Sequence, residues 1–212
     1  MKAMILHEFN TPLIEEIVSD PLPGYGEVVI RVHGCAVDQF DLTIKKGAIE
    51  GAKLPLILGH EVAGEVTSLG EGVNGINVGD RVASTLYVTC GYCRPCQTGS
   101  ETVCNNFLGY IGVQFDGGYA EFMKISAANL VQIGNSISYE EGSILANAIG
   151  TPYHGIIKRA RVRPGETVLI TGAGGGVGLH AIQLATLAGG RVMGADIGED
   201  KCSGILNMGA ER

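Results

Sequence analysis

Residues 167–196 read TVLITGAGGGVGLHAIQLATLAGGRVMGAD and decide the fold. The first five residues, TVLIT, predict a buried strand that ends at a glycine-rich run. The segment after the glycines has the apolar spacing of an amphipathic helix, and RVMGA predicts a second buried strand. A strand, a helix and a second apolar strand in this order predict the opening βαβ unit of a parallel α/β domain.

The glycine-rich run resembles the phosphate-binding pattern G-x-G-x-x-G, with Ala173 in place of the first glycine and with Gly175 and Gly178 in register. Such a pattern alone also fits a flexible linker, but the flanking strand and helix favour dinucleotide binding by the complete domain. Asp196 ends the second strand at the spacing expected of an acid that binds ribose hydroxyls. Its charge favours NAD(H) over NADP, because it repels a 2′-phosphate. The predicted cofactor-binding residues are Ala173, Gly175, Gly176, Val177, Gly178 and Asp196.

The chain before this unit has a different character. Residues 1–135 contain short strand-like runs separated by glycine and proline turns, which predicts a distorted antiparallel barrel or sandwich. Helical stretches begin near Ser138, which we expect to cap the first of them, with Glu141 completing a capping box. We place the boundary at about residue 150, so that 1–150 form a β-rich domain and 151–212 begin an α/β domain.

The predicted α/β domain contains only two strands. Only sixteen residues follow Asp196, enough for one short helix. Two parallel strands do not make a stable nucleotide-binding sheet, because both faces and both edges need cover. The sequence therefore favours a fragment of a longer protein; a sheet completed from elsewhere is the alternative.

Four of the six cysteines lie within residues 90–104, in the run CGYCRPCQTGSETVC. Four thiolates close a tetrahedral shell around zinc and leave no position open, so we expect a structural zinc site at Cys90, Cys93, Cys96 and Cys104. An iron–sulfur cluster is the alternative, although its usual bacterial run ends in Cys-Pro.

Composition excludes several classes of protein. The chain has 212 residues and a net charge of −7, so it lacks the basic surface that favours nucleic acid. No apolar run approaches the roughly 18 residues that span a bilayer, and no signal-peptide pattern appears. We therefore expect a cytoplasmic protein that binds neither nucleic acid nor a membrane.

The ordered motifs of the chain resemble the zinc-containing medium-chain dehydrogenase/reductase superfamily of alcohol dehydrogenases and quinone reductases. The resemblance rests, besides the cysteine run, on PLPGYGEVVIRV, LPLILGHEVAGEV, GVNGINVGDRV, GGYAEF, IGTPYHGI and ITGAGGGVGLHAIQLA. It implies a GroES-like catalytic domain and a Rossmann domain of which only the first βαβ is present, so that the chain is truncated within the Rossmann domain. It also implies a small-molecule substrate and a homo-oligomer at full length.

The resemblance also locates a catalytic zinc region in which this chain departs from the family pattern. In GCAVDQFDL, residues 34–42, Asp38 takes the place of the first cysteine ligand, and Phe40 replaces the hydroxyl residue that relays the alcohol proton. His60 is the second ligand, Asn147 takes the place of the third, and Glu61 is an alternative third ligand. Asp41 is the expected hydrogen-bond partner of His60, and Thr151 is expected near the nicotinamide.

Three functions stay open at this point. The missing thiolates and hydroxyl favour NAD(H)-dependent hydride transfer to an activated alkene, of the quinone or enoyl type, or to a small carbonyl. A zinc-dependent alcohol dehydrogenase with ligands Asp38, His60 and Asn147 or Glu61 is the second hypothesis. A zinc-bound fragment without catalysis is the third.

Overall fold

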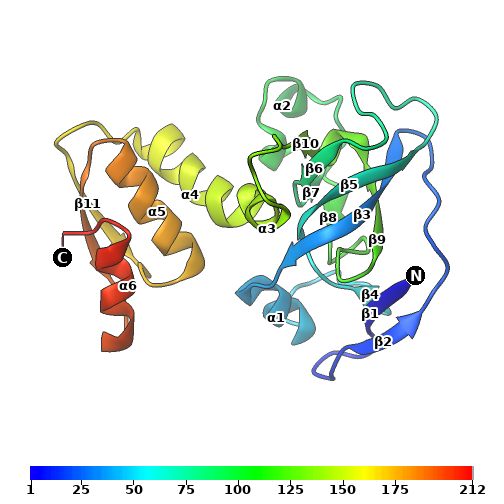
Figure 1. The fold of residues 1–212 in the computed structure, drawn as a ribbon, viewed down its shortest axis with the longest axis horizontal. Helices are drawn as coiled ribbons and strands as arrows, with labels where there is room; N and C mark the ends of the chain where they lie inside the picture. The colour runs from blue at the N-terminus through cyan, green and yellow to red at the C-terminus, as the bar shows by residue number, and fades with distance from the viewer. Residues whose placement is uncertain (212) are drawn as a thin grey trace. The chain divides into compact units, whose positions relative to one another are not determined.

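The computed structural model describes residues 1–211, and the chain divides into two compact units. The first unit is Met1–Ile144, and the second begins at Leu145. Figure 1 shows the β-rich first unit in blue to green and the second unit in yellow-green to red. The division falls before residue 150, because the helical segment that begins at Leu145 packs with the helices of the second unit.

The first unit is built on antiparallel sheets (Figure 1). The largest has the strand order β10 (Leu130–Gln132), β6 (Arg81–Ser84), β5 (Glu61–Leu69), β3 (Glu27–Ala36), β9 (Phe122–Ser126). A second has the order β2 (Ile14–Ile17), β1 (Lys2–Leu6), β4 (Leu56–Ile57), and β7 (Tyr87–Val88) pairs with β8 (Gly109–Tyr110). The antiparallel β-rich architecture expected from the turn spacing is confirmed.

The core of the first unit follows from the alternation of side chains along these strands. Val28 and Ile30 of β3 point to the same face and are fully buried, together with Val62 and Val66 of β5. Each such aliphatic side chain contributes about 1.5–3 kcal/mol by leaving water. The register between β3 and β5 shifts twice, and β3 ends at Ala36, two residues before Asp38. The strands thus fix where the predicted metal region begins.

Short helices lie between the strands of the first unit and after its last strand. They are α1 (Gln39–Lys45), α2 (Arg94–Gln97), α3 (Tyr139–Ser143) and the 3₁₀ turns η1 (Glu101–Val103) and η2 (Ala127–Asn129). The predicted capping box of α3 is confirmed: the Ser138 hydroxyl accepts from Glu141 N at 3.1 Å, and Ser138 N donates to the Glu141 carboxylate at 2.8 Å. Two backbone groups at the start of α3 are satisfied in this way.

The second unit contains the predicted βαβ. Its elements are η3 (Leu145–Ile149), α4 (Gly150–Tyr153), η4 (His154–Ala160), β11 (Thr167–Thr171), α5 (Gly176–Leu187), β12 (Arg191–Ala195), η5 (Glu199–Lys201) and α6 (Cys202–Asn207). β11 and β12 pair in parallel, as the sequence predicted. Ile170 and Val192 pack with Ala181 and Ile182 of α5, whereas Leu169 on the opposite face is 63% exposed.

Candidate active site and metal centre

The run after β3 begins a helix with an acidic cap. Asp38 Oδ1 accepts hydrogen bonds from Phe40 N at 2.7 Å and from Asp41 N at 3.1 Å, and Asp41 Oδ2 accepts from Asp38 N at 3.2 Å. The two aspartates therefore form a capping box at the start of α1. Asp38, expected only as a metal ligand, therefore also caps a helix, and an aspartate three residues before an acid is a recognisable signal for such a cap.

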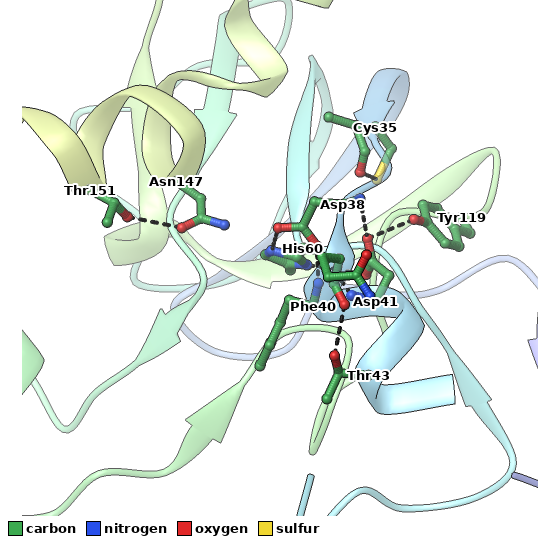
Figure 2. A network of polar contacts seen from close by, with 11 residues as sticks. Cys35, Asp38, Phe40, Asp41, Thr43, His60, Tyr119, Asn147 and Thr151 are labelled. Atoms are coloured by element: carbon green, nitrogen blue, oxygen red, sulfur yellow. Dashed lines mark hydrogen bonds and ion pairs between the residues drawn. The ribbon is translucent and has the colours of Figure 1, made fainter. Parts of the chain in front are cut away.

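His60 lies between the same two aspartates, as Figure 2 shows. Its Nδ1 is 3.1 Å from Asp41 Oδ1, and its Nε2 is 3.5 Å from Asp38 Oδ2. His60 is 1% exposed and Asp41 2% exposed, whereas the side chain of Asp38 keeps 31% of its surface in solvent. The fold thus brings together three side chains that lie 22 residues apart at most.

The two carboxylates control the charge of the imidazole. Burial acts to lower the pKa of His60, but the hydrogen bonds to Asp38 and Asp41 outweigh it and raise the pKa to about 9. Burial also acts to raise the pKa of Asp38, but the hydrogen bond and charge of His60 hold that pKa below its ordinary value. Without a metal, the group therefore contains an imidazolium between two carboxylates at neutral pH.

The donor set provides only part of a zinc site. Two ligands on a tetrahedral zinc lie about 3.3 Å apart, which suits the 3.5 Å between His60 Nε2 and Asp38 Oδ2. Both Asp41 oxygens already accept hydrogen bonds, from His60 and from Tyr119. Among the described residues, Asp38, Asp41 and His60 are a group close enough together to hold a metal ion. His60 and Asp38 suit two positions on a zinc ion, whereas Asp41 is engaged by His60 and Tyr119. The roles of Glu61 and Asn147 as a further ligand stay predictions.

Phe40 occupies the position beside His60 where a proton relay would need a hydroxyl. Its ring makes an edge contact with the His60 ring, with centroids 5.1 Å apart and an interplanar angle of 81°. The other edge contact of Phe40 is with Tyr110, at 6.2 Å. An apolar ring at this point shields the imidazole and transfers no proton.

Cys35 is not a member of the group formed by Asp38, Asp41 and His60. Its thiol packs against the core of the first unit, beside Gly59 and Gly118. Burial and the nearby carboxylates of Asp41 and Glu61 raise the pKa of Cys35, so the thiol stays protonated. A protonated, enclosed thiol is a poor ligand and a poor nucleophile.

Asn147 and Thr151 belong to the second unit. The Thr151 hydroxyl donates to Asn147 Oδ1 at 3.0 Å, across one helical turn (Figure 2). The roles of these two residues as ligand and nicotinamide contact stay predictions.

The four cysteines of the lobe gather as their spacing predicted. Cys93 Sγ lies 3.4 Å from Cys96 Sγ and 3.8 Å from Cys104 Sγ, and Cys90 Sγ lies 3.5 Å from Cys104 Sγ. Sulfur atoms on a tetrahedral zinc are about 3.8 Å apart, so the group fits the ion closely. None of the six cysteines forms a disulfide within the described chain.

The backbone of the lobe prepares these sulfurs to bind a cation. Burial acts to raise the pKa of Cys90, but N–H groups of Cys93 and Tyr92 donate to its sulfur, and the pKa falls to about 6. The N–H of Cys96 in the same way lowers the pKa of Cys93. These turns stabilise thiolates, which are the form that zinc binds.

The glycine loop lies at the carboxyl end of β11, next to the end of β12. Gly174 N donates to Asp196 Oδ2 at 2.7 Å, and Lys201 Nζ lies 2.8 Å from Asp196 Oδ1. The Lys201 ammonium and the Gly174 N–H hold the pKa of Asp196 below its ordinary value. The predicted acid thus lies against the loop, and it also pairs with Lys201, which no sequence motif had singled out.

Comparison with known proteins assigns the family. The model of the alcohol dehydrogenase GroES-like domain matches residues 24–135. The chain belongs to this family. Its GroES-like segment contains the Asp38–Asp41–His60 group and all four cysteines of the lobe.

Three similar proteins extend the comparison to the second unit. An acryloyl-coenzyme A reductase from Metallosphaera sedula is 41% identical over all of this chain and 63% of its own length. The structure of an NAD-dependent alcohol dehydrogenase superposes with a TM-score of 0.92 at 32% identity, over 100% of this chain and 62% of that one. The cobalt- and zinc-bound alcohol dehydrogenase from Pyrobaculum aerophilum has a TM-score of 0.90 at 35% identity, over 100% and 64%. The chain spans about three fifths of the length of these relatives.

No helix within residues 1–211 of this family member has the length and apolar character needed to cross a membrane.

The buried imidazolium of the GroES-like unit predicts a pH-dependent stability. The folded state raises the pKa of His60 from 6.5 to about 9. The stabilising contribution of His60 to the free energy of unfolding is therefore complete below pH 6.5 and is lost as the pH rises through 9. In metal-free protein the free energy of unfolding should fall by about 3 kcal/mol over this range. Urea unfolding at several pH values measures the fall, and His60→Gln should remove it. An equal fall in the variant would contradict the assignment to His60.

The glycine loop provides a matched pair of substitutions. A Cβ at Gly178 would lie 2.2 Å from the Gly172 carbonyl oxygen, whereas a Cβ at Gly176 would meet nothing within 4 Å. We expect Gly178→Ala to lower the free energy of unfolding by about 1–3 kcal/mol, because the loop and α5 must separate. Gly176→Ala, on the same helix, should be neutral or slightly stabilising. Thermal unfolding of both variants tests the pair, and equal melting temperatures would contradict the expected close packing.

Proposed function

We propose that the complete protein is an NAD(H)-dependent oxidoreductase that transfers hydride to an activated alkene. The observation that carries this proposal is the surroundings of His60, where two carboxylates and the Phe40 ring stand in place of thiolates and a hydroxyl relay. Alcohol oxidation needs a Lewis acid at the hydroxyl and a path for its proton. Alkene reduction needs neither. The similar acryloyl-coenzyme A reductase bears the name of such a reaction.

The proposed chemistry assigns a role to the charged imidazole. Bound NADH would supply hydride to the β carbon of an α,β-unsaturated carbonyl compound, whose C=C electron pair would move toward the carbonyl to give an enolate. A hydrogen-bond donor would stabilise the enolate oxygen, and a proton from water would then add to the α carbon. In this proposal the donor is His60, whose Nε2 faces the partly exposed side of the group, 3.5 Å from Asp38 Oδ2. The side chain of Asp38 keeps 31% of its surface in solvent, so a substrate would approach His60 from this side of the group.

The cofactor assignments are part of the same proposal. The loop from Ala173 to Gly178 binds the pyrophosphate, and Asp196 binds the adenosine ribose and selects NAD(H) over NADP. Zinc at Cys90, Cys93, Cys96 and Cys104 stabilises the lobe and takes no part in the reaction. The small-molecule substrate, the homo-oligomer and the cytoplasmic location stay predictions.

A zinc-dependent alcohol dehydrogenase is the second candidate. The 3.5 Å between His60 Nε2 and Asp38 Oδ2 suits two ligands on one ion, and a similar structure contains cobalt and zinc. This candidate needs a further ligand from Asn147 or Glu61, and a proton path that avoids Phe40.

Substrate and metal measurements on the complete protein separate the candidates. We expect NADH-dependent reduction of acryloyl-coenzyme A to exceed NAD⁺-dependent oxidation of small alcohols, with about one zinc per chain. Alcohol oxidation with about two zincs per chain would instead support the second candidate. NADH titration addresses the third hypothesis, a zinc-bound fragment without catalysis, which tight binding by the 212-residue chain would exclude.

A further inference from the structure

Asp41 has a third partner in Tyr119, a residue to which the sequence analysis assigned no role. The Tyr119 hydroxyl donates to Asp41 Oδ2 at 2.8 Å, and Asp41 Oδ1 faces His60 Nδ1 at 3.1 Å (Figure 2). Asp41 is 2% exposed, so these groups replace the water that a carboxylate requires. Tyr119, Asp41 and His60 therefore form one continuous chain of hydrogen bonds.

The backbone fixes Tyr119 relative to His60. Tyr119 N donates to Leu58 O at 2.9 Å, and Met4 N donates to Tyr119 O at 2.8 Å. Leu58 lies two residues before His60, so the segment that carries the phenol is bonded directly to the segment that carries the imidazole. The two ends of the hydrogen-bond chain are thus held by backbone as well as by side chains.

Gly59 makes room for the phenol ring. A Cβ at Gly59 would lie 2.6 Å from Tyr119 Cδ1, and Gly59 has a φ of +95° that side chains rarely adopt. The ring therefore packs against the backbone immediately before His60. Burial and the Asp41 charge raise the pKa of Tyr119, so the hydroxyl remains a donor.

We propose that Tyr119 is a positioning residue that acts on His60 through Asp41. Its hydroxyl fixes the Asp41 carboxylate in the orientation that accepts the His60 Nδ1 proton, so that Nε2 faces Asp38. Without the phenol hydroxyl, Asp41 Oδ2 keeps the Asp38 N–H at 3.2 Å, a longer contact that restrains the carboxylate less. The effect on catalysis rests on the proposed function of His60, whereas the effect on the imidazole does not.

The test is Tyr119→Phe in the complete protein, with Tyr139→Phe as the matched control. Tyr139 is also partly buried in the first unit, and its ring stacks on His33 at 4.4 Å, away from the Asp41 group. The first measurement is the nitrogen and proton NMR spectrum of the His60 ring, whose Nδ1 proton reports its bond to Asp41. The second is steady-state kinetics with NADH and acryloyl-coenzyme A.

We expect Tyr119→Phe to shift the His60 Nδ1 proton and speed its exchange with water, and to lower kcat about tenfold with little change in KM. Tyr139→Phe should change neither. An unchanged His60 spectrum would overturn the proposal, whatever happens to kcat. A shifted spectrum in a protein that reduces no alkene would support Tyr119 as a positioning residue and overturn the proposed function.

A second variant covers the case in which Tyr119→Phe does not fold. Incorporation of 3-fluorotyrosine at position 119 keeps the ring and makes the phenol a stronger donor. The NMR signal of the His60 Nδ1 proton should then change its chemical shift, whereas the same label at position 139 should leave that chemical shift unchanged. An unchanged chemical shift with the label at position 119 would contradict the proposal.

Discussion

Replacing Cys96 by serine is expected to remove zinc from the chain and to lower the melting temperature by roughly 10 °C or more. Cys96 Sγ is 3.4 Å from Cys93 Sγ in a four-sulfur group, and a hydroxyl does not replace a thiolate on a closed zinc site. The lobe around α2 and η1 contributes no residue to the buried aliphatic cores, so the ion is its main source of order. Elemental analysis and thermal unfolding measure the two effects.

The control for this substitution is Cys202→Ser. Cys202 is exposed at the start of α6 and lies outside the four-sulfur group. Zinc content and melting temperature should both stay at the values of the unmodified protein. If Cys96→Ser kept its zinc, or lost it without a change in melting temperature, the structural role of the lobe would be disproved.

Asp41→Ala is expected to have the second large effect, a loss of about 3–5 kcal/mol in the free energy of unfolding. The substitution removes the acceptor of His60 Nδ1, of the Tyr119 hydroxyl and of Asp38 N at once. A buried imidazolium then loses one of its two carboxylate neighbours, and the first turn of α1 loses half of its capping box. Chemical denaturation at pH 7 measures the loss.

Asp20→Ala is the matched comparison for Asp41→Ala. Asp20 also forms an ion pair, at 2.7 Å from the N-terminal ammonium, but its side chain is 65% exposed. Solvent screens such a pair, so we expect a change within about 0.5 kcal/mol. Similar losses for the two variants would show that the Asp41 group stabilises the fold no more than a surface pair.

Features determined over a short stretch of chain could be predicted from the sequence. The spacing of Cys90, Cys93, Cys96 and Cys104 predicted a cluster, because turns of CxxC type direct two sulfurs to one point. Ser138 and Glu141, which are three residues apart, predicted the start of a helix. The βαβ unit was predicted from the spacing of apolar residues, which changes from that of a strand to that of a helix and back. In each case the interacting groups are near neighbours in sequence or repeat with a regular period.

The contacts of the His60 group could be predicted only in part. The partnership of Asp41 with His60 came from the family resemblance, and the geometry agrees with it. The contact of Tyr119 with Asp41 joins residues 78 positions apart, and nothing in GGYAEF distinguishes a hydrogen-bonding phenol from a packed one. Such contacts depend on strand pairing, which determines which distant segments meet.

The double use of Asp38 constrains how this site can evolve. One of its oxygens accepts the backbone N–H groups that begin α1, and the other faces His60. A return to cysteine at this position would supply a soft ligand but would remove the cap, at a cost of about 1 kcal/mol. Asp38 therefore links metal preference to helix stability, so an exchange of this ligand for a thiolate would also weaken the start of α1.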